Sequence, residues 1–217
     1  VWGDRSMTVS PVLKEEKRDD AFNFTPANLK KAKAHIAKYP KGRQASAVLP
    51  LLDLAQRQNG GWLPRNAMEA VANMLEMPVI RVFEVATFYT MFNLKPIGVH
   101  HVQVCTTTPC WLRKSSDILQ ACKKHLKVKV GETTTDGKFT LSEVECLGAC
   151  VNAPMVQIND DFFEDLTAES MTEILKKISK GEKVTAGPQI DRHLSAPEGG
   201  ATTLSVFLKD EDKKEGV

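Results

Sequence analysis

Four of the five cysteines in this 217-residue sequence form two close pairs. Four residues separate Cys105 from Cys110, three separate Cys146 from Cys150, and 35 residues lie between the pairs. An apolar run that alternates like a β-strand precedes each pair, so both pairs are predicted to lie in loops at strand ends. Four thiolates that converge from two such loops are the ligand set that a soft metal centre requires.

Three kinds of chemistry fit a set of four cysteines. A [2Fe-2S] cluster takes all-cysteine ligation, although the plant-type ferredoxin spacing C-x4-C-x2-C differs from the two distant pairs here. Structural zinc also accepts four cysteines, usually with a shorter gap between the pairs. Dithiol redox chemistry normally uses C-x-x-C, which neither pair has. The spacing favours the cluster and leaves zinc and a dithiol site as alternatives.

The residues around the pairs also suit a sulfur-ligated centre. Three threonines at 106–108 offer donors that could hydrogen-bond to sulfur, and Gly148 would let the backbone approach a bulky centre closely. Glu143 and Glu145 lie just before the second pair. We hypothesise that these carboxylates disfavour the addition of an electron and so lower the reduction potential of a cluster.

The remaining cysteine and a histidine pair have simpler interpretations. Cys122 lies on the apolar stripe of a predicted helix, and free cysteines are among the most frequently buried residues, so it is interpreted as a core residue. His100 and His101 precede the first cysteine in a predicted strand. Because four cysteines already complete a ligand set, the two histidines are interpreted as strand or packing residues.

Composition excludes several classes of protein. The chain is 42% hydrophobic and 26% charged with a net charge of +2, which argues against nucleic acid as a main partner. Its apolar runs are shorter than the roughly 18–20 residues of a membrane span. An odd number of cysteines and no secretory segment argue against a disulfide framework. Because the chain begins with Val1, we expect a removed leader or a trimmed start.

Periodicity divides the chain into four parts. Residues 1–24 show no sustained pattern and are predicted to form an extended arm. Residues 25–97 are predicted to form a small helical bundle, because apolar residues recur at helical spacing between capping and breaking residues. A helix-turn-helix DNA reader would also be built from short helices, but residues 64–93 hold only two basic side chains, Arg65 and Arg81.

The second half is predicted to form a thioredoxin-like domain over residues 98–183. Strands are expected at 99–104, 139–145, 155–159 and 162–166, with a hairpin turn at Asp160 and Asp161, and helices at 111–126 and 167–181. Residues 127–130 form either a short strand or the approach to a loop. Residues 184–217 are predicted to be an extended tail, within which the apolar stretch at 204–208 could dock onto another subunit. The fold class is therefore α+β.

Two motifs resemble a known family. The stretches His101–Leu112 and Glu145–Pro154, which contain the two cysteine pairs, resemble the thioredoxin-like [2Fe-2S] ferredoxin family. The helical stretch from Gly61 to Tyr89 is similar to the N-terminal domain of the branch found in mitochondrial respiratory complex I, the NADH:ubiquinone oxidoreductase. The similarity covers about residues 20–185, and the cysteine pattern shows no departure from that of the family.

The resemblance implies a function as an electron carrier. Cys105, Cys110, Cys146 and Cys150 match the family's ligand positions and would hold one [2Fe-2S] cluster that exchanges single electrons with FMN. The resemblance places NADH and FMN on a partner flavoprotein subunit, with the large iron-sulfur subunit of complex I as a neighbour. It also implies the matrix side of the mitochondrial inner membrane, in the peripheral arm of complex I. This chain has no G-x-G-x-x-G or Walker motif of its own.

Overall fold

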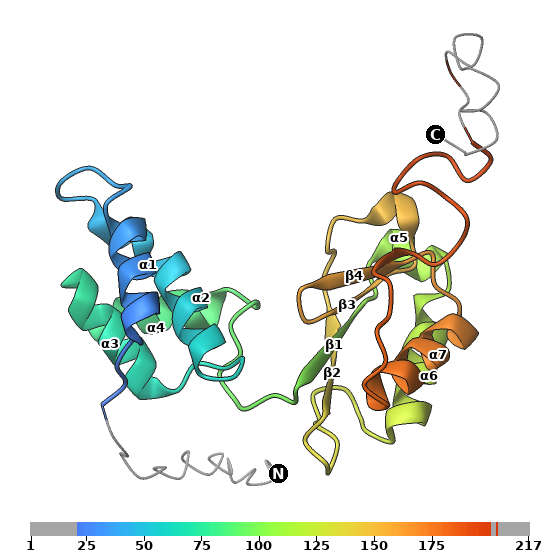
Figure 1. The fold of residues 1–217 in the computed structure, drawn as a ribbon, viewed down its shortest axis with the longest axis horizontal. Helices are drawn as coiled ribbons and strands as arrows, with labels where there is room; N and C mark the ends of the chain where they lie inside the picture. The colour runs from blue at the N-terminus through green and yellow to red at the C-terminus, as the bar shows by residue number, and fades with distance from the viewer. Residues whose placement is uncertain (1–20, 201–202, 204–217) are drawn as a thin grey trace, which may run out of the picture. The chain divides into compact units, whose positions relative to one another are not determined.

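A computed structural model describes residues 21–200 and residue 203, which divide into two compact units between Pro96 and Ile97 (Figure 1). The first unit is helical and the second combines helices with a sheet, so the predicted α+β class is confirmed. The apolar stretch at 204–208 and residues 1–20 of the predicted arm lie outside the described residues. Among the described helices, none has the length and apolar character of a membrane span.

Short helices with well-marked ends build the first unit. Thr25 caps α1, its side chain accepting a hydrogen bond from the Asn28 N–H, and Pro26 occupies the first helical position. Pro64 and Pro78 stand directly before the third and fourth α-helices. The elements are α1 (Pro26–Ile36), the 3-10 helix η1 (Gln44–Ala47), α2 (Val48–Gln58), α3 (Arg65–Leu75) and α4 (Val79–Phe88).

One buried glutamine fastens the segment after α4 to the helices. The Gln56 side chain donates to the Met91 carbonyl at 3.0 Å and accepts from the Asn93 N–H at 2.7 Å. The Asn93 carbonyl in turn accepts from the Leu63 N–H at 2.8 Å. These bonds satisfy polar groups beside the apolar core of the unit, where an unpaired group would be costly.

A five-stranded sheet forms the centre of the second unit, in the order β2-β1-β3-β4-β5. β1 pairs in parallel with β2 and antiparallel with β3, and β4 pairs antiparallel with β3 and in parallel with β5. The strands are β1 (His100–Cys105), β2 (Phe139–Val144), β3 (Val156–Ile158), β4 (Asp161–Glu164) and β5 (Gly187–Pro188). The helices are α5 (Thr108–Leu112), α6 (Ser115–Leu126), the 3-10 helix η2 (Cys150–Asn152) and α7 (Ala168–Ser179).

Two helices cover one face of this sheet, α6 and α7, which run side by side in Figure 1. Alternate residues of β1, Val102 and Val104, point into the same buried cluster as Leu119 of α6 and Leu175 of α7. Thr167 caps α7 in a capping box with Ser170. The period-2 pattern of the strands and the helical stripe of α7 therefore agree on a single apolar core.

The region after the first cysteine pair differs from the prediction of one helix over residues 111–126. The chain forms α5, leaves the helical conformation at Lys114 with φ of 67°, and begins α6 at Ser115. Leu112, which we expected on the buried face, has an exposed fraction of 68%. The prediction was wrong because the left-handed Lys114 rotates α5 out of the phase of the α6 stripe.

One smaller prediction in the second half is also corrected, and one open alternative is decided. The hairpin turn falls at Asn159 and Asp160 rather than at Asp160 and Asp161, because Asn159 takes up the left-handed conformation, with φ of 55°. Asp161 becomes the first residue of β4. Residues 127–130 form no strand and lead into the loop before β2.

One glycine allows the closest backbone approach at the start of the sheet. A Cβ on Gly98 would lie 2.9 Å from backbone atoms of Lys138 and Phe139, which is closer than real Cβ contacts. The Gly98 N–H donates to the Thr140 hydroxyl at 2.6 Å. Gly98 therefore lets the residues before β1 lie directly against the start of β2.

Part of the segment predicted as an extended tail belongs to the sheet. β5 pairs with β4 in register with Phe163 and Glu164. The Gln189 N–H then donates to the Glu164 carbonyl at 3.0 Å. The chain after α7 is thus fastened to the second unit as far as the residues that follow β5.

Candidate metal centre

The parallel pairing of β1 and β2 brings the two cysteine loops to the same edge of the sheet. Cys105 is the last residue of β1 and pairs in register with Val144, the last residue of β2. Cys146 follows Val144 by two residues. Because parallel neighbours end at the same edge, loops that are far apart in sequence leave the sheet next to each other.

The first pair is buried. Cys105 and Cys110 each have an exposed fraction of 1%, and they pack with Ala153 and Met155 in a small apolar cluster. β1 ends at Cys105, and Cys110 lies within α5, which begins at Thr108. The Cys105 N–H donates to the Met155 carbonyl at 3.4 Å. A strand end and a helix therefore fix both members of this pair.

The second pair faces solvent. Cys146 is exposed and Cys150 is half-buried, and their Sγ atoms lie 3.3 Å apart. The Gly148 N–H donates to Cys146 Sγ at 3.4 Å. Gly148 has φ of 89°, so glycine is favoured here by the left-handed backbone of the turn.

The surroundings of Cys110, Cys146 and Cys150 shift the pKa values of these thiols. Burial, followed by a hydrogen bond with Cys105, raises the pKa of Cys110 to about 12. The hydrogen bond from the Gly148 N–H lowers the pKa of Cys146, and the Cys150 side chain contributes in the same direction. The hydrogen bond between Cys150 and Cys146 raises the pKa of Cys150. Cys146 therefore forms a thiolate more readily than Cys110 or Cys150 does.

One threonine links the two pairs. Thr107 Oγ1 lies 3.3 Å from Cys105 Sγ, and its side chain also hydrogen-bonds to Cys146 and lowers the pKa of that thiol. Thr106 instead donates to Glu143 Oε1 at 2.7 Å. Thr107 therefore contacts sulfur, as predicted for the threonines. Thr106 instead binds Glu143, one of the two glutamates expected to lower the reduction potential.

The donor set fits a binuclear iron-sulfur cluster, because four thiols from two loops are the ligands such a cluster takes. The thiols approach each other in two pairs, Cys105 with Cys110 and Cys146 with Cys150. A [2Fe-2S] centre divides its four ligands between two irons, whereas structural zinc needs four around one ion.

The other sequence candidates lie outside this set. Cys122 is fully buried in the core between α6 and the sheet, as we expected, and burial raises its pKa to about 12. His101 is buried, and its Nε2 lies 2.8 Å from Ser142 Oγ. Burial lowers the pKa of His101. Both residues have packing partners in the sheet or its core.

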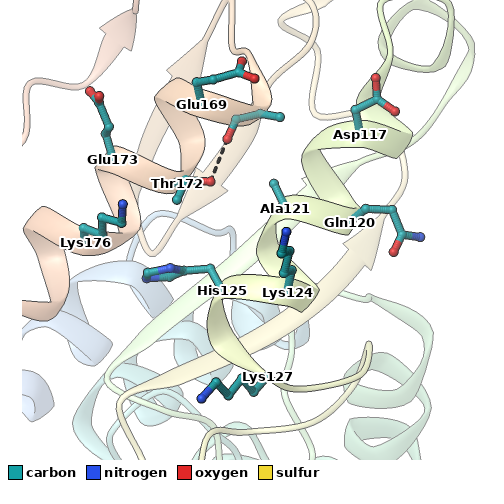
Figure 2. Close-up of a pocket in the computed structure, with 11 residues that line it drawn as sticks. Asp117, Gln120, Ala121, Lys124, His125, Lys127, Glu169, Thr172, Glu173 and Lys176 are labelled. Carbon is teal, nitrogen blue, oxygen red and sulfur yellow. Dashed lines mark hydrogen bonds between the residues drawn. The ribbon is translucent and has the colours of Figure 1, made fainter.

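A groove of about 760 Å³ between α6 and α7 lies apart from the cysteines (Figure 2). Side chains of both charge signs line it, among them Asp117, Lys124, Glu169 and Lys176. None of the four paired cysteines belongs to its lining. The four paired cysteines therefore lie at the sheet edge and not in this groove.

Sequence reasoning missed the polar residues behind the second loop. Asn152 and Asp165 are buried, and their side chains hydrogen-bond at 3.1 Å. Arg192 forms an ion pair with Asp165 from the segment after β5. The sequence offered one signal, the polar Asn152 directly after a cysteine loop, but nothing in the local pattern pointed to Arg192.

The chain belongs to the thioredoxin-like [2Fe-2S] ferredoxin family. The family model of that description matches residues 32–179, which include all four paired cysteines and most of the helical unit. The family binds one [2Fe-2S] cluster, and the cysteine geometry described above fits such a cluster.

Two named relatives are similar to this chain over most of its length. A subunit of the NADH-quinone oxidoreductase of Rickettsia conorii is 66% identical over 157 residues, which are 72% of this chain and 94% of that protein. The mitochondrial NADH dehydrogenase [ubiquinone] flavoprotein 2 of Dictyostelium discoideum is 55% identical over 183 residues, 84% of this chain and 74% of that protein. Both relatives are subunits of an oxidoreductase, which agrees with the predicted class.

A solved structure shares the fold. The crystal structure of an NAD+-reducing [NiFe]-hydrogenase aligns with a TM-score of 0.54 at 18% sequence identity. The alignment covers 65% of this chain and 26% of the hydrogenase chain.

Proposed function

We propose that this chain is the electron-carrier subunit of NADH:ubiquinone oxidoreductase, with Cys105, Cys110, Cys146 and Cys150 as ligands of its [2Fe-2S] cluster. The observation that carries the proposal is the convergence of the two cysteine loops at the shared edge of β1 and β2. The similarity to the Rickettsia and Dictyostelium relatives supports the choice of complex. When bound, the cluster supplies one-electron redox chemistry with the FMN of a partner flavoprotein.

The protein's own residues would have three tasks at this centre. The buried first pair, with Met155 and Ala153 around it, excludes water from one side. The exposed Cys146 leaves the other side open to a partner surface. Donors such as the Gly148 N–H and the Thr107 hydroxyl reach the sulfur atoms, and hydrogen bonds of this kind tune the potential of a cluster.

The partners and the location follow from the same proposal. The chain would bind the NADH- and FMN-containing flavoprotein and the large iron-sulfur subunit, without binding nucleic acid. We propose the matrix side of the mitochondrial inner membrane, which the Dictyostelium relative supports. The similarity to the Rickettsia protein supports the choice of complex.

Metal and sulfide analysis of the purified chain tests the proposal. We expect two irons and two acid-labile sulfides per chain, visible absorbance and a rhombic EPR signal on reduction. A colourless, EPR-silent protein with stoichiometric zinc would instead establish a zinc-stabilised interaction module. In the purified complex, rapid freezing after NADH addition should show whether the EPR signal follows flavin reduction.

A further inference from the structure

A buried ion pair lies directly behind the second cysteine loop. Arg192 Nη1 is 2.7 Å from Asp165 Oδ1, and the two side chains have exposed fractions of 7% and 5%. Arg192 follows β5, and Asp165 follows β4. Because burial of two charges is costly, such a pair is stable only when its remaining donors and acceptors also find partners.

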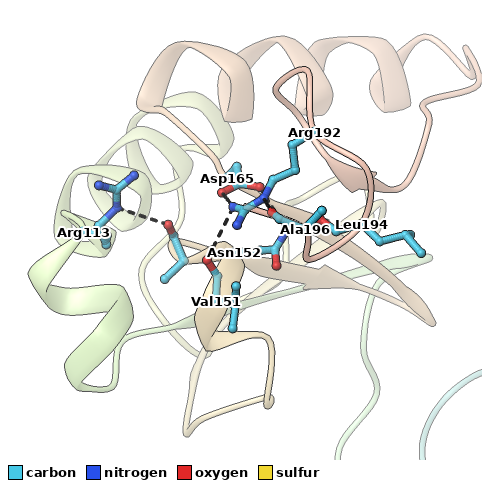
Figure 3. Close-up of polar contacts among 8 residues, drawn as sticks. Arg113, Val151, Asn152, Asp165, Arg192, Leu194 and Ala196 are labelled. Atoms are coloured by element: carbon cyan, nitrogen blue, oxygen red, sulfur yellow. Dashed lines mark hydrogen bonds and ion pairs between the residues drawn. The ribbon is translucent and has the colours of Figure 1, made fainter. Parts of the chain in front are cut away.

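The remaining donors of Arg192 and the second oxygen of Asp165 bind groups in and around the loop (Figure 3). Arg192 Nε donates to the Ala196 carbonyl at 2.8 Å, and its Nη1 also reaches the Val151 carbonyl at 3.5 Å. Asp165 Oδ2 accepts from the Asn152 side chain at 3.1 Å. Asn152 Nδ2 donates in addition to the Leu194 carbonyl at 2.8 Å.

Val151 and Asn152 are the residues that directly follow Cys150 in η2. The Asp165 N–H donates to the Asn152 carbonyl at 2.8 Å, so Asp165 holds Asn152 through both its main chain and its side chain. Arg192 orients Asp165 and reaches Val151 itself. Through Val151, Arg192 in the segment after β5 contacts the residue next to Cys150.

We propose that Arg192 is a positioning residue for the second cysteine pair, acting through Asp165 and Asn152. The inference rests on the proposed function, because it concerns how Cys150 is oriented toward the cluster. Its role is distinct from ligation and from the docking of a partner. Outer contacts of this kind fix ligand orientation and tune the electronic properties of a metal centre.

The test is made on the full-length chain with its cluster. Arg192→Leu is expected to accelerate cluster loss to an iron chelator by about 10- to 100-fold, the range usual for lost supporting contacts. The g-values of the reduced cluster should shift as well. Arg192→Lys keeps the charge beside Asp165 and should recover slow release in large part.

A double variant separates positioning from simple destabilisation. Arg192→Leu with Asp165→Asn leaves no unpaired charge, so the fold should recover its thermal midpoint. We expect release and g-values to remain altered, because Asn152 is no longer held by a carboxylate that Arg192 orients. The matched control is Lys180→Leu, which removes an exposed pair with Glu182 and should leave both readouts unchanged.

Two results would overturn the positioning role and the proposed function separately. A double variant with wild-type release and wild-type g-values would show that the ion pair serves the fold alone. A wild-type chain without a [2Fe-2S] signal would instead overturn the proposed function, and the positioning role with it.

Discussion

The two cysteine loops reach the same edge of the sheet by different means. Cys105 and Cys110 are buried, one at the end of β1 and the other inside α5, so regular secondary structure holds the first pair. Cys146 is exposed, and its loop is shaped by a glycine turn and by side chains from distant segments. A site of this kind has one half fixed by the backbone and one half fixed by long-range polar contacts.

The largest expected effect, at the proposed ligands, would sharpen this comparison. Cys110→Ala and Cys146→Ala should both abolish the cluster, because each removes one of four thiolates. The cluster-free proteins should differ: Cys110→Ala truncates a buried side chain and lowers the free energy of unfolding, whereas Cys146→Ala changes an exposed position. Iron content, EPR and thermal unfolding of the cluster-free forms measure the two effects.

The matched control for these variants is Cys122→Ser. It should retain the cluster while losing about 1–3 kcal/mol of stability, because a hydroxyl replaces a fully buried thiol in the core. Loss of the iron in Cys122→Ser together with its retention in Cys150→Ser would show that the ligand set was wrongly assigned.

A second change tests the strands that carry both loops. Gly98→Ala places a Cβ 2.9 Å from the backbone of Lys138 and Phe139, at the start of β2. We expect a loss of about 1–3 kcal/mol in the unfolding free energy of the second unit, as for other overpacked sites. Urea unfolding measures it, and Gly199→Ala, with open space around its Cβ, is the control that should be neutral.

The smallest expected effect concerns pH and the strand that leads to the first pair. Burial holds the pKa of His101 below its usual value of about 6.5. The unfolded chain therefore binds a proton at a higher pH than the folded chain does. Stability from this residue is complete above about pH 6.5 and declines as the pH falls toward the folded pKa.

His101→Gln is expected to flatten this decline, which unfolding curves between about pH 7 and pH 5 would reveal. His35→Gln, a substitution in the first unit, serves as the control. An identical pH dependence in wild type and His101→Gln would contradict the assignment of the effect to His101.

Local signals predicted most of the fold, and the spacing of the cysteines named both pairs that the structure brings to one edge of the sheet. Capping residues such as Thr25 and Thr167 correctly indicated where helices start, and strand alternation located β1 and β2. The break at Lys114 was missed because a left-handed lysine has no distinctive sequence signature. The Asp165–Arg192 pair was missed because it joins residues 27 apart that share no periodic pattern.

The fastening of the chain beyond β5 has a practical consequence for how the second unit can be divided. A fragment that stops at residue 183, where the helical and strand patterns end, would omit β5, Arg192 and the Leu194 carbonyl. Asp165 would then be left as a buried carboxylate without its cation. The shortest fragment that keeps the polar contacts behind Cys150 extends to Ala196, which is the sensible end point for isolating this half of the protein.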